Sequence, residues 1–476
     1  MRVDTLVENG RVVSPFSGVS EADIAISDGK ISALLQRPHD VEAAHVIDAA
    51  GKYLLPGIID PHVHFGLGSP DDYTSETMAA ATGGVTTVGN FLMRAEPYED
   101  HFDAERQKGE ESAYVDFVLH FTVMNDHHVA HLSEYIQMGV PTFKYFMSFK
   151  GDEGRYIGVT GSDDGLLYEF FEELGKHPQA TTAIHTENIE VVWRLRKRLQ
   201  EAGANDLAAW DRSRPDFVEA DDLHTACYFA RLTKAKIYVV HVSCKEAMDV
   251  ARDQKRLYGG ISVETCPHYL THTRDTELGL LGKVNPPLRS EKDIETLWEA
   301  VFDGTVDVIG SDHNSRRREK KSGNIWQATA GFPGTATLLP VLLSEGVNKR
   351  GLDLGRVVQL TSYNPARIFN LYPRKGAIEI GSDADLTMVD LNLEREVKPA
   401  ELHSFSDYSL YEGQTLKGWP VLTMVRGRII MKDGEIVGDK GYGRFIPRLC
   451  CDNGGVVIGM TIAEKVLAAH SGKQEV

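Results

Sequence analysis

The sequence predicts an α/β fold in which a (β/α)8 barrel lies beside a smaller β-sandwich domain. Eight short apolar runs, all rich in β-branched residues, support the barrel, and they lie at 54–65, 85–92, 116–123, 141–148, 181–188, 236–243, 261–268 and 306–314. Helical patterns occur between the runs, for example at 168–177, 189–200 and 220–235. Apolar runs that alternate with helices are typical of buried parallel strands, and a closed barrel brings the carboxyl ends of its strands to one face.

A second domain is expected because the chain has 476 residues and a barrel needs about 250. Short strand-like segments with turn residues fill 1–52 and 375–440. Neither segment alone has enough apolar alternation to bury a core, so we expect the two to pair into one composite β-sandwich. The expected divisions are 1–55 and 373–445 for the two parts of the sandwich, 56–372 for the barrel, and 446–476 for an extension at an oligomer interface.

Composition and charge narrow the function. The net charge of -18 and the pI near 5.5 argue against nucleic acid as a partner, because phosphate binding needs a basic face. No apolar segment is long enough for a membrane span, and the first ten residues lack the apolar core of a signal peptide, so we expect a cytoplasmic protein with no membrane partner. The five cysteines show no CxxC spacing, which predicts reduced, mainly buried thiols. The basic run 316–321 leaves open a solvated loop or a lid over an anionic substrate.

Four histidines at the ends of apolar runs predict a metal centre. His62 and His64 are two residues apart on a strand, so their imidazoles point to the same side and can hold one cation. His185 and His241 end the fifth and sixth runs, where they can supply neutral imidazoles to a second cation. A lone HxH pair is weak evidence, but four histidines at one end of one barrel favour a centre of two divalent metals.

Lys144 and Asp312 complete the predicted centre. An ammonium beside two dications would be repelled, and a neutral amine can bind only one metal. Carbamylation of Lys144 by CO2 resolves both problems, since the carbamate is anionic and its two oxygens can bridge the metals. Asp312 ends the eighth run, where one oxygen can bind a metal while the other holds the proton of a bridging hydroxide. The alternative for Lys144 is an ordinary salt bridge at a strand end.

Several motifs in this chain resemble the cyclic amidases of the amidohydrolase superfamily: PGIIDPHVHF, GVPTFKYFM, HTEN, VVHVSCKEA, ETCPHYL, KVNPPLR and IGSDHN. That group contains dihydropyrimidinase (hydantoinase), allantoinase and dihydroorotase, and the resemblance covers about residues 1–445. It implies zinc as the metal, dimers or tetramers as the assembly, and hydrolytic opening of a cyclic amide as the reaction. By the same resemblance the bridging hydroxide attacks the ring carbonyl, while Asp312 passes the hydroxide proton to the leaving nitrogen.

Departures from the three subfamilies bear on the substrate. Dihydroorotases place an arginine where this chain has Gly66, which argues against dihydroorotate. Hydantoinases place an oxyanion-stabilising tyrosine where this chain has Phe149, so Tyr145, Tyr156 or the metals would have to compensate. Their substrate-binding asparagine is replaced by Ala330.

Residues that line the expected pocket favour a hydantoin or dihydropyrimidine ring as the substrate. Asn285 either contacts the amide edge of the substrate or caps a turn. Phe149, Met93 and Phe332 make the expected pocket apolar, which suits a ring bulkier or less polar than allantoin. An allantoinase-like ureide hydrolase is the second candidate, and an inactive scaffold of the same fold is the third.

Overall fold

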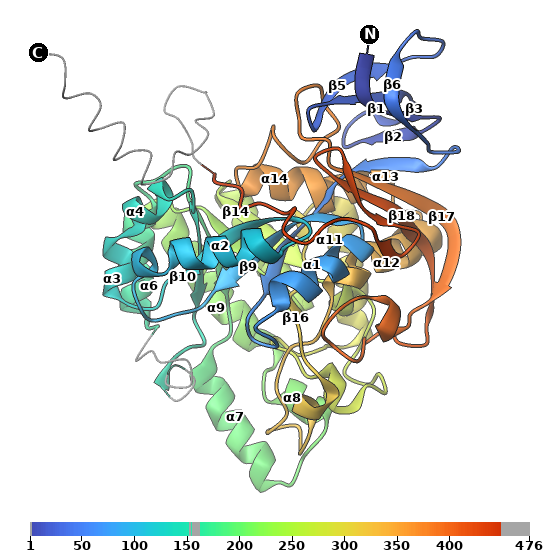
Figure 1. The fold of residues 1–476 in the computed structure, drawn as a ribbon. Helices are drawn as coiled ribbons and strands as arrows, with labels where there is room; N and C mark the ends of the chain where they lie inside the picture. The colour runs from blue at the N-terminus through green and yellow to red at the C-terminus, as the bar shows by residue number, and fades with distance from the viewer. Residues whose placement is uncertain (1, 152–153, 155–161, 449–476) are drawn as a thin grey trace, which may run out of the picture.

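The predicted barrel is present in the computed structural model, which describes residues 2–151, 154 and 162–448 (Figure 1). Every neighbouring pair of barrel strands is parallel, and the final segment closes the ring, since β15 pairs with β14 and β16 pairs with β8. The strands are β8 (Ile58–His64), β9 (Val85–Leu92), β10 (Asp116–Thr122), β11 (Thr142–Phe146), β12 (Thr181–His185), β13 (Ile237–Val239), β14 (Ile261–Thr265), β15 (Val308–Ile309) and β16 (His313–Asn314).

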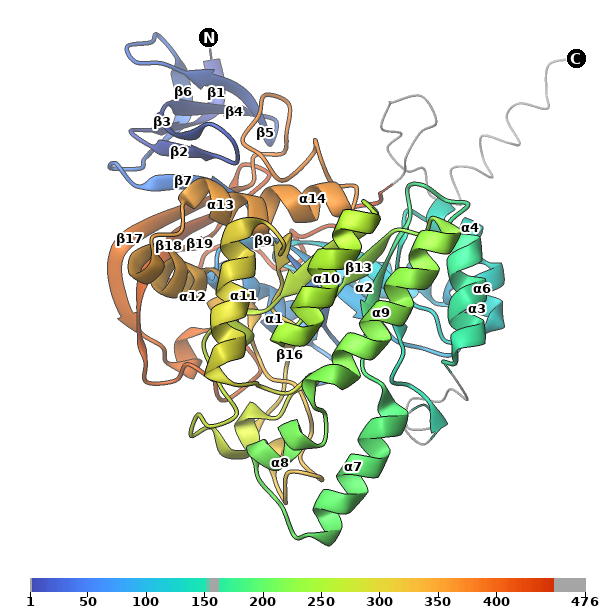
Figure 2. The same ribbon diagram turned by 180° about the vertical axis from the view of Figure 1, so that it is seen from behind.

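Helices surround the barrel, and the expected helices at 168–177, 189–200 and 220–235 correspond to α6, α7 and α9. In Figures 1 and 2, α7 and α8 extend beyond the barrel at its lower edge. The α-helices are α1 (Asp72–Thr82), α2 (Phe102–Ser112), α3 (Asp126–Ala130), α4 (Leu132–Gln137), α6 (Asp164–Leu174), α7 (Ile189–Glu201), α8 (Leu207–Arg212), α9 (Asp216–Thr233), α10 (Lys245–Leu257), α11 (Glu291–Asp303), α12 (Leu338–Val341), α13 (Leu354–Val358) and α14 (Asn364–Ile368).

Shorter helical segments of other types join these elements. The 3-10 segments are η1 (Tyr98–Asp100), η2 (Pro267–Leu270), η3 (Gly279–Gly282), η4 (Arg318–Lys321), η5 (Thr335–Thr337) and η8 (Pro399–Glu401), and the π-helices are η6 (Leu342–Asn348) and η7 (Gln359–Tyr363). Within the described ranges, no helix has both the length and the apolar character needed to cross a membrane.

Two predicted strands differ in detail from the observed ones. The run 54–65 is divided at Gly57, where a Cβ would overlap Thr86; residues 53–56 form β7 of the other domain, and the barrel strand begins at Ile58. The run 306–314 is interrupted at 310–312, between β15 and β16, and Gly310 lies so close to the carboxylate of Glu264 that a Cβ there would overlap it. This interruption leaves the side chain of Asp312 at the end of the barrel.

The composite β-sandwich is confirmed, because β7 from the N-terminal segment pairs antiparallel with β17 from the C-terminal segment. One sheet has the order β5-β4-β1-β6 and the other β20-β19-β18-β17-β7-β2-β3. Their shared core contains Ile24 and Leu54 from the first segment and Leu386 and Met424 from the second. The strands are β1 (Arg2–Glu8), β2 (Arg11–Ser14), β3 (Gly18–Glu21), β4 (Asp23–Ser27), β5 (Lys30–Leu35), β6 (Glu42–Asp48), β7 (Tyr53–Pro56), β17 (Leu386–Glu396), β18 (Thr415–Val425), β19 (Arg428–Lys432) and β20 (Glu435–Ile436).

On this pairing we propose the division into 1–55 with 373–445 and 56–372 as the two domains. Of the expected extension 446–476, the structure describes only 446–448, where Arg448 is buried against the barrel and donates to Thr142 Oγ1 at 2.7 Å. Burial lowers the pKa of Arg448 to about 9. The predicted buried thiols are observed for Cys227, Cys244 and Cys266; Cys450 and Cys451 lie outside the described residues.

A buried ion cluster joins the sandwich to the barrel. Lys375 Nζ lies 2.8 Å from Asp116 Oδ2 on β10 and 3.5 Å from Asp383 Oδ2, and it also contacts Asp385. Arg426 contacts the other oxygen of Asp116. Burial alone would lower the pKa of Lys375, but the three carboxylates outweigh it and raise that pKa above its ordinary value. The cluster therefore holds positive and negative side chains together in one buried site.

Replacing Lys375 by methionine is expected to lower the free energy of unfolding by about 3–5 kcal/mol, because buried carboxylates would lose their counter-charge. Urea titrations of the two proteins measure this change. The matched control is Lys398→Met: the Lys398 side chain is 55% exposed beside Glu401, and its replacement should change stability by no more than about 0.5 kcal/mol. Equal stability of the Lys375→Met protein and the wild type would contradict this account of the cluster.

Candidate metal centre

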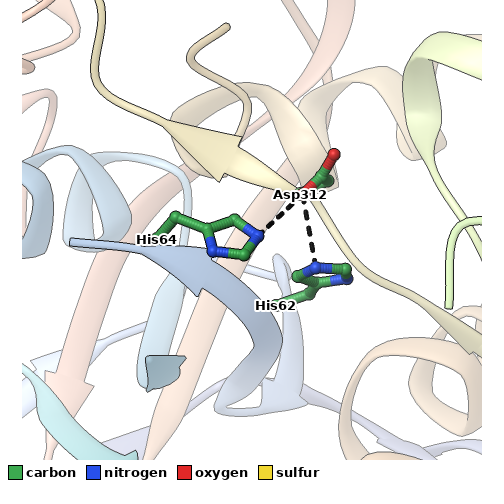
Figure 3. Close-up of side chains that lie close together, drawn as sticks. All are labelled: His62, His64 and Asp312. Atoms are coloured by element: carbon green, nitrogen blue, oxygen red, sulfur yellow. Dashed lines mark ion pairs between the residues drawn. The ribbon is translucent and has the colours of Figure 1, made fainter. Parts of the chain in front are cut away.

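The structure brings His62, His64 and Asp312 together at the end of the barrel (Figure 3). Asp312 Oδ1 lies 3.2 Å from His62 Nε2 and 3.2 Å from His64 Nε2. One atom from each side chain lies within 4.8 Å of the others, which is the spacing of a cluster able to hold a cation. The pair of imidazoles comes from β8, and the carboxylate comes from the interruption between β15 and β16.

Asp312 and His241 both have left-handed backbone conformations, with φ of 49° and 42°. A non-glycine residue adopts such a φ at a cost of about 1–3 kcal/mol, so the surrounding structure must impose it. For Asp312 the neighbouring Ser311 supplies that restraint, since its N–H and Oγ donate to Asp60 at 3.0 and 2.5 Å. Both side chains are thereby directed into the barrel mouth instead of continuing along a strand.

A second group lies beside the first. His185 Nδ1 is 2.9 Å from His241 Nε2, and the ring of His241 stacks on that of His62 at 5.5 Å between centroids. Lys144 lies close to both groups, because its charge acts on His64 of the first group and on His185 and His241 of the second. Its Nζ is 5.0 Å from the ring of Phe91 and 4.7 Å from that of Phe146. All six predicted residues therefore converge at one end of the barrel.

The amine of Lys144 has no hydrogen-bond partner among the described residues, and its side chain is buried. Burial lowers its pKa to about 8, although the charge of Asp312 acts in the opposite direction. No carboxylate forms an ion pair with this lysine in the described part of the chain, so the salt-bridge alternative does not describe its surroundings. A buried amine of this kind exists in part as the neutral form that reacts with CO2.

Two buried carboxylates behind the histidines were not predicted as site residues. Glu264 accepts from His62 Nδ1 at 2.7 Å, from the N–H of His241 at 2.9 Å and from Tyr238 at 2.6 Å. Glu187 accepts from His185 Nε2 at 2.8 Å and pairs with Arg214 at 2.9 Å.

These two carboxylates determine which nitrogens face the barrel mouth. Each one binds the far nitrogen of its histidine, which leaves His62 Nε2 and His185 Nδ1 unprotonated toward the mouth. Burial by itself raises the pKa of Glu187, but Arg214 and His185 outweigh it and hold that pKa at about 2. The glutamates in the motifs ETCPHYL and HTEN could have indicated this role, since carboxylates commonly orient metal-binding histidines.

Replacing Glu264 by glutamine is expected to weaken metal binding at the His62 group about 10- to 100-fold, because the amide cannot orient the imidazole as an anion does. Metal retained after dialysis against a chelator series, measured by elemental analysis, tests this. Glu299→Gln, at an exposed position of α11, is the control. Unchanged retention would show that the carboxylate does not support the centre.

The three predicted substrate contacts lie in different surroundings. Asn285 Oδ1 is buried without a hydrogen-bond partner among the described residues. Ala330 lies on an adjoining segment, where the next residue, Gly331, donates to the carbonyl of Lys283 at 3.0 Å. Phe149 stacks on Phe146 at 4.2 Å between ring centroids.

One of the two tyrosines expected to replace the missing oxyanion donor is engaged elsewhere. Tyr145 donates its hydroxyl to the carbonyl of Asp163 at 2.9 Å, so it points away from the centre. Tyr156 lies outside the described residues, and its role as a donor stays a prediction.

The basic run 316–321 lies against the segment 406–412, and its residues 317–320 are exposed to solvent. The N–H of Arg316 donates to Ser406 Oγ at 2.9 Å, and Arg318 forms an ion pair with Glu412. Lys321 is buried and donates to the carbonyl of Lys283 at 3.0 Å. The exposed residues agree with the solvated-loop alternative, while the contacts at both ends hold the run in position.

The chain belongs to the amidohydrolase family, whose model matches residues 53–430. It is a hydrolase of the hydantoinase and allantoinase type. An L-hydantoinase from Paenarthrobacter aurescens is 33% identical to it, over 94% of this chain and 98% of that protein. An allantoinase from Rubrobacter xylanophilus is 34% identical, over 93% and 97%.

Solved structures with a similar fold belong to the same type of enzyme. An L-hydantoinase (dihydropyrimidinase) from Arthrobacter aurescens superposes with a TM-score of 0.88 at 32% identity, covering 94% of this chain and all of that one. A dihydropyrimidinase from Brevibacillus agri gives a TM-score of 0.85 at 30% identity, covering 94% and 98%. The likeness thus extends over both domains.

Proposed function

We propose that this protein opens the ring of a hydantoin- or dihydropyrimidine-type cyclic amide by hydrolysis. The centre would consist of two divalent cations, zinc by the donor types, held by His62, His64, His185, His241 and Asp312 and joined by a carbamate on Lys144. The observation that carries the proposal is the buried amine of Lys144, which lies close to both groups of imidazoles and has no hydrogen-bond partner among the described residues. Such a pair of cations supplies an activated water and a Lewis acid for the carbonyl.

The unpartnered atoms of the site support a metal centre. His62 Nε2, which faces Asp312, is buried without a hydrogen bond meeting ordinary geometry among the described residues, as is Lys144 Nζ. Leaving these buried polar atoms unsatisfied would cost about 1–3 kcal/mol each. Imidazole and carboxylate donors in this number suit zinc and related transition metals better than magnesium or calcium.

The remaining residues have roles in handling the substrate. Asp312 would hold the proton of the attacking water and deliver it to the leaving ring nitrogen, which prevents expulsion of an unstable amide anion. Asn285 would accept an N–H of the ring through its unpartnered Oδ1. Phe149 and Phe146 would form an apolar wall at the mouth, and Ala330 leaves space where a larger side chain would contact the ring.

Allantoin is the second candidate substrate, favoured by the allantoinases among the relatives and by the absence of a tyrosine at Phe149. An inactive scaffold would not need a buried lysine at this costly position. We also propose, from the family likeness, a cytoplasmic protein that assembles as a dimer or tetramer.

Metal content and substrate turnover test the proposed function together. Elemental analysis should give two metals per chain for the centre, and intact mass under native conditions should include one CO2. The substrate panel contains dihydrouracil, hydantoin, aryl-substituted hydantoins, allantoin, dihydroorotate and cyclic imides. Turnover of hydantoins or dihydrouracil supports the proposal, and turnover of allantoin alone supports the second candidate. Absence of metal and of turnover after reconstitution with zinc and bicarbonate would overturn both.

A further inference from the structure

A second cluster of metal-binding side chains lies away from the candidate centre. Glu99 in η1 follows β9, while His127 in α3 and His131 directly after α3 follow β10. One ligand atom from each lies within 4.8 Å of the others. His127 Nε2 is 2.7 Å from Glu99 Oε1, and the two imidazole rings stack at 3.8 Å between centroids. The histidines are one helical turn apart and therefore face the same side.

Hydrogen bonds orient two of these side chains as a metal site requires. His131 Nδ1 is 2.8 Å from the carbonyl of His127, and because a carbonyl only accepts, Nδ1 carries the hydrogen and Nε2 has a free lone pair. Glu99 Oε2 accepts from the hydroxyl of Tyr135 at 2.9 Å, which leaves Oε1 turned toward His127. Metal-binding histidines and carboxylates are typically held in this way by a partner at the second atom.

Exposure and donor type indicate which ion would bind. His127 is 40% exposed and Glu99 26% exposed, so a cation reaches the cluster from solvent without unfolding. Two imidazoles and one carboxylate suit a transition-metal dication such as zinc, whereas magnesium and calcium prefer oxygen donors throughout. In the described ranges this cluster and the one at His62 are the two groups of three such side chains with metal-site spacing.

We propose that Glu99, His127 and His131 bind a zinc-class divalent cation, separately from the candidate catalytic centre. The cation replaces the proton that His127 shares with Glu99 and completes its coordination with water. This site does not depend on the proposed hydrolytic function, because it contains none of the residues assigned to that function.

A bound cation would link two segments that follow neighbouring barrel strands. The segment after β9 is already held to α3 by two contacts: Asn125 Nδ2 donates to the carbonyl of Ala95 at 2.9 Å, and His128 Nε2 lies 3.1 Å from the carbonyl of Glu96. A metal between Glu99 and the two histidines adds a third link between the same segments. The first of these segments follows β9, the strand that carries Phe91, whose ring lies 5.0 Å from Lys144 Nζ.

Zinc titration of metal-free protein against a chromophoric chelator tests the site. The wild type should bind one equivalent more than the His131→Ala protein, whatever number the catalytic centre takes. In Glu99→Gln the same equivalent should bind at least about tenfold more weakly, because the anionic ligand is lost. The control is His224→Ala, an exposed histidine of α9, which should match the wild type.

Thermal denaturation supplies a readout that does not depend on counting metals. Zinc should raise the denaturation midpoint of the wild type more than that of His131→Ala, since a cation that binds only the folded state stabilises it. Hydrolytic activity of the two proteins under saturating zinc confirms that the variant is folded. Equal zinc stoichiometry and equal midpoint shifts in wild type and His131→Ala would overturn the proposal.

Discussion

Replacement of Lys144 by alanine should reduce kcat/KM about 10³- to 10⁴-fold, equivalent to about 4–5.5 kcal/mol of transition-state stabilisation. The lysine lies close to both groups of imidazoles, so its loss removes the anion that would join the two cations. Steady-state kinetics on the best substrate of the panel measures the effect. Metal content should fall in the same protein, because the remaining ligands no longer balance the charge of two dications.

Rescue of the Lys144→Ala protein by an added carboxylic acid distinguishes loss of the carbamate from damage to the fold. A short carboxylic acid such as acetate can enter the space left by the lysine side chain and supply two oxygens in the same place, so it should restore part of the activity. Lys150→Ala, six residues further along and partly exposed, is the matched control and should retain full activity. Activity of the Lys144→Ala protein within threefold of the wild type would eliminate the carbamate from the mechanism.

Replacement of Asp312 by asparagine should lower kcat about 10²- to 10⁴-fold, because the amide cannot carry a proton from the attacking water to the leaving nitrogen. Burial by itself would raise the pKa of Asp312, but the imidazoles of His62 and His64 outweigh it and hold that pKa far below its ordinary value. The carboxylate is therefore ionised and ready to accept. Asparagine keeps the shape, so the loss reports the proton transfer more than the packing.

The choice of substrate separates the two roles of Asp312. If it delivers the proton, the defect should shrink for rings whose leaving nitrogen is more acidic, since such a nitrogen needs less protonation. If it serves only as a metal ligand, every substrate should suffer equally and metal content should fall. Asp307→Asn, five residues earlier and paired with Lys255, is the control. A uniform defect with normal metal content would contradict the proton-transfer role.

The barrel was predictable because a parallel strand buried on both faces is apolar along its whole length, and all eight runs contain a barrel strand. The interruption at 310–312 was not predictable, since Asp312 has a left-handed backbone that its residue type does not require. The division of the first run at Gly57 was also missed, because the close approach of Thr86 to this glycine is a contact between distant segments. Contacts between segments distant in sequence leave no periodic pattern.

The convergence of the six predicted metal ligands could be expected because they stand in apolar runs whose carboxyl ends a barrel brings to one shared face. Their supporting residues were harder to predict, because Glu264 and Glu187 acquire their roles only from the imidazoles that fold against them. The cluster around Lys375 is the clearest example of contacts that the sequence does not predict. Asp116 lies in one domain and Asp383 and Asp385 follow near the other end of the chain, and nothing in their local sequences links them.

The pairing of β7 with β17 has a consequence for synthesis of the chain. During translation β7 emerges from the ribosome early, but its partner strand β17 begins at Leu386, after the whole barrel has been made. Until then β7 has an unpaired edge and an apolar face, both of which favour association with other nascent chains. The domain that is translated first therefore cannot complete its sheet until β17 has been made.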